Sequence, residues 1–144
     1  MHTPTTPATS PDRARLPAML ATLCSYESWL GPYHPQSLRL MIQVGAAYWQ
    51  AGHPEHARAM LERAIANLGQ HLGMNHDLRL SAMVALRDVF VARRDYERAA
   101  AVEKELLECR TARLGSDHPE TIATRANLAR IILETIDRNS NREV

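Results

Sequence analysis

The chain has 144 residues, of which 45% are hydrophobic, 23% are charged and only 5% are aromatic, and its formal net charge is +1. This length suits one domain with an aliphatic core. Because the charge is balanced, no strong field gathers phosphates, and we expect no nucleic-acid partner.

Residues 1–12 are rich in Thr and Pro and contain no apolar segment, so they predict a disordered tail and not a signal peptide. No apolar run reaches the ~18 residues that span a bilayer. Cys24 and Cys109 match no metal or redox spacing, and both fall on apolar helix faces, which predicts buried free thiols. We therefore expect a cytoplasmic protein without membrane contact.

Apolar residues recur at steps of three and four, which predicts an all-α fold. In chain order the helices are expected at residues 13–29, 36–51, 54–70, 78–93, 96–112 and 119–137, and residues 138–144 form a second tail. Pro17 within the first segment predicts a late start or a kink. One helical domain should therefore cover residues 13–137.

A six-residue segment recurs with a period of 42 residues, at 30–35, 72–77 and 114–119, and reads Leu-Gly-x-x-His followed by Pro or Asp. Glycine supplies the positive φ that ends a helix, and Pro35 and Pro119 suit the first turn of the next one. Asp77 replaces proline in the second copy and is expected to cap that turn. The histidine of each copy is interpreted as a junction residue that hydrogen-bonds a helix end.

These features resemble the 42-residue tetratricopeptide repeats of kinesin light chains and of many bacterial repeat proteins. The matching residues are Val44, Gly45, Tyr48, Gly52, Ala57 and Asn127-Leu128-Ala129. The resemblance implies a right-handed α-solenoid of antiparallel helix pairs. Two departures stand out: Arg87 replaces a small residue and Arg94 replaces the turn glycine, so the second repeat is expected to pack less tightly than the first.

The resemblance also implies a concave groove, lined by the first helix of each pair, that binds a peptide or a helix. Carried over position by position, the groove residues are Arg39, Ile42, Gln43, Ala46, Trp49, Gln50, Val84, Asp88, Val91, Asn127 and Arg130. Trp49 is either the anchor of this site or a filler between repeats. The arginines either clamp a carboxylate or are simply solvated.

Catalysis and metal binding find little support in the sequence. His53 and His56 are three residues apart, but two histidines without a third ligand make a poor zinc site. No nucleophile, base and orienting group stand out together, and no phosphate-binding loop is present. We expect neither an enzyme, nor a cofactor, nor a metal.

The terminal helices predict a second interaction surface. In the last helix Ile122, Ala126, Ala129, Leu133 and Ile136 form the seam expected to face inward, and Leu128, Ile131 and Ile132 widen the apolar surface outward. A terminal repeat usually presents a polar outer face. The first helix offers Leu16, Leu20 and Leu23 as a complementary face. An end-to-end homodimer would cover both surfaces, unless the tail folds back over the outer isoleucines.

The sequence thus predicts a non-catalytic protein-interaction adaptor with a peptide-binding groove. The alternative is a structural module that self-assembles through its terminal helices.

Overall fold

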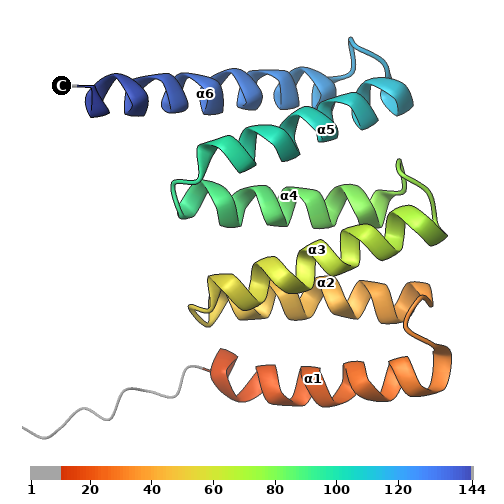
Figure 1. Cartoon of the computed structure of the whole chain (residues 1–144). Coiled ribbons are helices and arrows are strands. Elements are labelled where there is room, and N and C mark those ends of the chain that lie inside the picture. The colour runs from red at the N-terminus through yellow and green to blue at the C-terminus, as the bar shows by residue number, and fades with distance from the viewer. Residues whose placement is uncertain (1–10, 144) are drawn as a thin grey trace, which may run out of the picture. The chain divides into compact units, whose positions relative to one another are not determined.

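The computed structural model describes residues 11–143, and the side chains of residues 15–143. Six α-helices make up nearly all of this part of the chain (Figure 1). They are α1 (Pro11–Leu30), α2 (Pro35–Gln50), α3 (Pro54–His71), α4 (Asp77–Ala92), α5 (Tyr96–Leu114) and α6 (Pro119–Arg142). The prediction of six helices is confirmed, and most of their ends lie within two residues of the expected positions.

Both ends of the described chain differ from the prediction. α1 begins at Pro11 and continues through Pro17, so this proline does not delay the helix start. α6 continues to Arg142, so most of the tail expected from residue 138 is helical. Of the tail expected at residues 1–12, residues 11 and 12 belong to α1, and residues 1–10 lie outside the described residues.

The chain divides into two compact units, with the division within α3. The described residues up to Met60 form unit 1, in which α1 packs against α2. Residues from Leu61 form unit 2, in which α4 packs against α5 and α5 against α6 (Figure 1).

Three junctions of nearly identical geometry precede α2, α4 and α6. The glycine of each has a positive φ, 90° at Gly31, 100° at Gly73 and 88° at Gly115. The histidine three residues later is the N-cap, and its ring Nδ1 accepts a hydrogen bond of 3.2 Å from the backbone N–H two residues further on. A histidine can serve here because its unprotonated ring nitrogen is an acceptor, as a serine or aspartate oxygen is. The predicted junction role of the histidines is confirmed.

Asp77 does not cap α4, as the sequence had led us to expect, because His76 already does so. The Asp77 carboxylate instead accepts a hydrogen bond from Arg113 of α5. This hydrogen bond lowers the pKa of Asp77 below its ordinary value. The change from proline to aspartate therefore links α4 to α5.

The turn between the helices of a pair requires a left-handed residue at its centre. Gly52 occupies this position in the first repeat with φ 82°, and Arg94, 42 residues later, adopts φ 59°. An L-residue in this conformation is strained by roughly 1–2 kcal/mol, whereas glycine is not. The arginine at the turn therefore costs stability without changing the turn.

We expect Arg94→Gly to stabilise the protein by about 0.5 kcal/mol. The substitution relieves the backbone strain. It also increases the conformational entropy of the unfolded chain, which offsets roughly 0.5–1 kcal/mol of that gain. The opposite kind of change, Gly52→Ala, should lower the melting temperature, because alanine is strained at this positive φ. The added Cβ would meet no atom within 4 Å, so a steric clash does not contribute to the loss. Thermal unfolding measures both, and shifts of equal sign would contradict the explanation.

The core of each unit is aliphatic. In unit 1 the buried apolar side chains are Leu16, Leu23, Leu38, Met41, Val44 and Ala57. In unit 2 a central cluster joins Leu80 and Met83 of α4 to Leu106 and Cys109 of α5. Cys109 is a buried free thiol, as predicted, and its burial raises the pKa of the thiol. Cys24, by contrast, is exposed on α1, so the prediction that it is buried was wrong.

Two ion pairs cross from α4 to α5 inside unit 2. Arg87 donates to both carboxylate oxygens of Glu103, at 3.3 and 3.1 Å, and Glu103 is completely buried. Burial by itself lowers the pKa of Arg87, but hydrogen bonds to Asp88 and Glu103 outweigh it and leave the pKa above its ordinary value. Arg79, which is also buried, donates to Glu105 at 2.6 Å. At position 87, where the repeat pattern predicts a small residue, a charged pair therefore links α4 to α5.

Candidate protein-interaction surfaces

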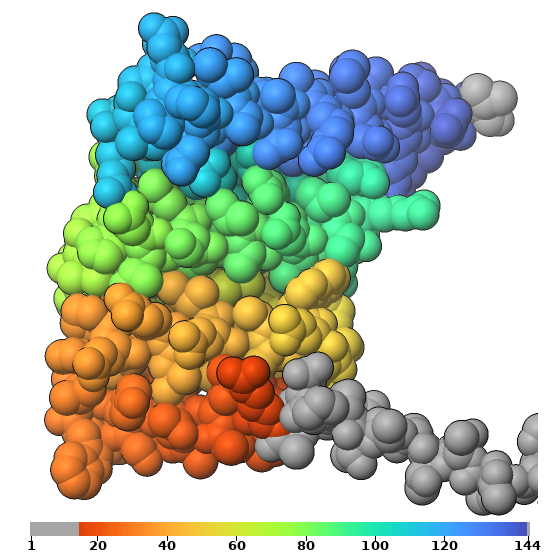
Figure 2. All heavy atoms as spheres, turned by 180° about the vertical axis from the view of Figure 1, so that it is seen from behind, coloured from red at the N-terminus to blue at the C-terminus, as the bar shows by residue number. Residues whose placement is uncertain are grey.

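The residues predicted for the groove on α2 form a partly open surface on unit 1. Arg39, Gln43 and Gln50 are exposed, whereas Ile42, Ala46 and Trp49 are half-buried. The exposed members follow one another at steps of four and seven residues, which places them on one face of the helix. Figure 2 shows this side of unit 1, where α2 adjoins α1.

Two shallow hollows lie between α1 and α2, and Gln43 lines both of them. The first is lined by Arg15 and Met19 of α1 and by Gln43, Ala46, Ala47 and Gln50 of α2. The second is lined by Thr22 and Tyr26 of α1 and by Gln36, Arg39, Leu40 and Gln43 of α2. Both linings combine amide and apolar groups with one arginine each, and neither contains a carboxylate. They therefore suit backbone amides and acidic groups better than cations.

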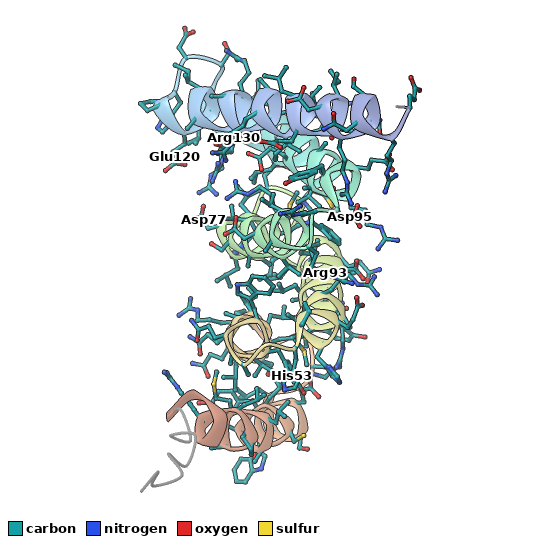
Figure 3. All side chains as sticks on the ribbon, turned by 90° about the vertical axis from the view of Figure 1, so that its left-hand side faces the viewer. His53, Asp77, Arg93, Asp95, Glu120 and Arg130 are labelled. Atoms are coloured by element: carbon teal, nitrogen blue, oxygen red, sulfur yellow. The ribbon has the colours of Figure 1, made fainter. Side chains whose placement is uncertain are left out.

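The groove residues predicted on unit 2 are divided between α4 and α6. Asp88 is exposed and accepts hydrogen bonds from Arg87, while Val84 and Val91 are half-buried. On α6, Arg130 is exposed and its Nη2 lies 3.5 Å from Oδ1 of Asn127. In Figure 3 the labelled side chains of Asp77, Glu120 and Arg130 lie on the same side of this unit.

A third hollow, of about 420 Å³, lies on unit 2. It is lined by Asp77, Leu80, Ser81 and Val84 of α4, by Arg110 of α5 and by Glu120 of α6. Of the predicted groove residues, only Val84 is part of it. Because its lining carries both positive and negative side chains, this hollow favours an acidic ligand less strongly than the hollows on unit 1 do.

His53 and His56 lie beside Tyr48 at the turn between α2 and α3. The Tyr48 and His56 rings are stacked with their centroids 5.1 Å apart, and the His53 ring meets each of them edge-on. Among the residues that the structure describes, no group of three or more His, Cys, Asp or Glu side chains could hold a metal ion. The aromatic contacts account for these histidines without a ligand.

The residues predicted for self-association are mostly not available for it. Leu16, Leu23 and Ile131 are buried, and Leu20 and Leu128 are half-buried. Only Ile132 remains exposed, at 43%. The prediction that Leu16, Leu23 and Ile131 form an outward surface was therefore wrong.

The seam of α6 that we expected to pack inward lies outward instead. Ile122, Leu133 and Ile136 are 50%, 61% and 53% exposed. Thr121 and Thr124 are buried in their place, because Arg110 of α5 donates to the Thr124 hydroxyl at 2.5 Å and that hydroxyl donates to the Glu120 carbonyl. Satisfied hydroxyls can enter a helix interface that an apolar residue would otherwise occupy. α6 therefore carries an apolar stripe on its outer face.

Exposed aromatic side chains near the end of α1 were missed by the sequence reasoning. Trp29 is 88% exposed, and Tyr26 and Tyr33 are 38% and 49% exposed. The only sequence signal was the position of Trp29 beside a junction glycine, which does not distinguish a buried from an exposed ring.

None of the described helices is long and apolar enough to cross a membrane. No curated protein matches the sequence. Two tetratricopeptide repeat models match residues 21–70 and 89–120, which together make up more than half of the chain.

Two solved structures share the fold. One is the crystal structure of nearly identical TPR-like repeats from a protein of Podosopora anserina assigned as a kinesin light chain, with 21% identity and a TM-score of 0.75. The match covers 86% of this chain and 59% of that one. A point variant of the same protein matches with the same identity and TM-score over 58% of its length. The present chain thus spans less than two thirds of these relatives. The predicted fold class, an all-α solenoid of helix pairs, is confirmed, and the chain belongs to the tetratricopeptide repeat family, with repeats like those of kinesin light chains.

Proposed function

We propose that this chain is a non-catalytic protein-interaction adaptor that binds a peptide or a helix along the first helices of its repeats. Tetratricopeptide repeats generally mediate interactions between proteins, and this supports the general class. On unit 1 the binding surface would comprise α2, and unit 2 carries its own candidate faces on α4 and α6.

The hollows of unit 1 are the observation that supports this proposal most directly. Four of the six predicted groove residues on α2, namely Arg39, Gln43, Ala46 and Gln50, line them. Gln43, shared by both hollows, can donate to and accept from the backbone of an extended or helical ligand. Arg15 and Arg39 would attract a carboxylate. The expected ligand is therefore a peptide with small apolar side chains and at least one acidic residue.

The test is a capture experiment from the native lysate with the wild-type chain, Trp49→Glu and Gln43→Glu side by side. We expect a protein bound by the wild type to be lost with both variants, because an anchor residue contributes about 2 kcal/mol or more, roughly a 30-fold loss of affinity. Gln43 is exposed, so its variant retains the fold even if the half-buried Trp49 does not tolerate a charge.

Trp29→Glu is the matched control, since it introduces the same charge at an exposed tryptophan outside α2. It should capture the same proteins as the wild type. If all four chains capture the same set, the α2 surface is not the binding site and the proposal fails.

A second candidate function is self-assembly through the terminal helices, as a homodimer or a larger assembly. The exposed apolar stripe of α6 favours it, because each isoleucine left in water forgoes about 1.5–3 kcal/mol of burial. Light scattering at tens of micromolar should show a mass above that of one chain, and Ile132→Arg should lower it. A wild-type chain that stays monomeric there would exclude this candidate.

A further inference from the structure

The packing of α4 on α5 provides a template for a contact between two copies of the chain. With the 42-residue period, α6 repeats α4 one period later, and α1 repeats α5 two periods earlier. Each residue of the α4–α5 interface therefore has a counterpart on α6 or on α1. Among the described residues no helix covers the matching face of α6.

The charged contact of the template has an apolar counterpart on both sides. Ala129 of α6 stands where Arg87 stands on α4, and Met19 of α1 stands where Glu103 stands on α5. The buried ion pair Arg87–Glu103 is thus exchanged for a pair of apolar side chains. A change on one side only would leave a charge without a partner.

The apolar contact of the template has a polar counterpart on both sides. Met83 of α4 packs against Leu106 and Cys109 of α5. The matching residues are Arg125 on α6, and Thr22 and Ser25 on α1. Both hydroxyls donate to carbonyls of their own helix, at 2.9 and 3.1 Å, so their oxygens remain able to accept from a guanidinium.

The exposure of the matching faces agrees with this complementarity. Arg125 and Ala129 are exposed, and so are Ile122 and Ile132, the counterparts of the buried Leu80 and Phe90. On α1, Thr22 and Ser25 are exposed, and Met19 and Thr22 each line one of the hollows beside α2. None of the residues that the structure describes on unit 1 therefore fills the first-helix position beside α1.

We propose that α6 of one copy packs against α1 of a second copy, in the register that places Ala129 beside Met19 and Arg125 beside Thr22 and Ser25. This inference rests on the self-assembly candidate and names its partner surface. The two surfaces are different, so the contact leaves one α1 and one α6 uncovered in every pair of copies. Such a heterologous contact continues beyond two copies unless it closes into a ring.

The test uses two variants that each block one surface, Ala129→Arg and Met19→Arg, with the mass measured by light scattering. The wild-type mass should rise with concentration beyond that of two chains. Each variant alone should associate more than about tenfold more weakly, because a charge is buried without a partner. In an equimolar mixture, α6 of the Met19→Arg chain can still bind α1 of the Ala129→Arg chain. The opposite contact would bring two arginines together, so the mixture should reach twice the mass of one chain and stop there.

A charge-pair rescue tests the register. The double variant Ala129→Arg with Met19→Glu places the template's own ion pair at the contact and should regain growth with concentration. Ala112→Arg on α5, an exposed alanine outside both helices, should associate like the wild type. Circular dichroism would check that all variants remain folded.

The outcomes separate the inference from the self-assembly candidate. A wild type that stays monomeric overturns both. A wild type that associates, but whose single variants associate equally well or whose mixture stays monomeric, overturns the α6–α1 contact alone. Because Met19 and Thr22 also line the hollows proposed to bind a peptide, a bound α6 would compete with the peptide on unit 1. Peptide capture is therefore measured at a concentration at which the chain is monomeric.

Discussion

Replacing Glu103 with glutamine is expected to destabilise the protein by about 3 kcal/mol, because it leaves the guanidinium of Arg87 inside unit 2 without its buried partner. Asp88 remains as a partner for Arg87, but it is exposed and cannot replace a carboxylate within the interface. Urea denaturation of the wild type and the variant measures the difference.

Two further variants identify the cause of this loss. Glu108→Gln, the same change at an exposed position of α5, should alter stability by less than about 0.5 kcal/mol. The double variant Arg87→Met with Glu103→Leu should lie within about 1 kcal/mol of the wild type, since apolar groups can replace a buried ion pair. If the double variant is less stable than Glu103→Gln alone, the explanation through an unpaired charge is wrong.

Leu106→Ala should cost about 3 kcal/mol, through lost burial and the cavity left between α4 and α5. Leu106 is completely buried and lies at the centre of the unit 2 cluster. Leu133→Ala removes the same atoms from a leucine that is 61% exposed, and its stability should change by less than about 1 kcal/mol. Equal losses in the two variants, measured by urea denaturation, would contradict the assignment of Leu106 to the core.

The junctions could be predicted because their causes are local. Within six residues, a glycine adopts the positive φ, a histidine caps the next helix and a proline begins its first turn. The single error, at Asp77, arose because the carboxylate found a partner on another helix, Arg113, 36 residues away. No short window of sequence contains that information.

The orientation of α6 could not be predicted for the same reason. Hydrophobicity alone places Ile122 inward and Thr124 outward, but the structure reverses them. The reversal depends on Arg110, whose guanidinium reaches the Thr124 hydroxyl from the preceding helix. The burial of Glu103 was likewise not predicted. Its partner Arg87 had been interpreted only as a departure from the repeat pattern, and not as one half of an ion pair.

The candidate site was predicted in part. The face of α2 followed from the repeat register, and four of its residues line the hollows. The half-burial of Trp49 and the exposure of Trp29 depend on neighbouring helices, and the sequence offers no rule for either ring.

The likeness of the three junctions has a consequence for how such a chain can grow. The φ angles of His34, His76 and His118 agree within a few degrees, at −67°, −65° and −66°, and each cap bonds only within its own junction. A 42-residue segment copied in tandem at a glycine would therefore meet the same backbone geometry at both of its seams. Duplication or loss of one such cassette in the gene changes the number of helix pairs while preserving every turn between them.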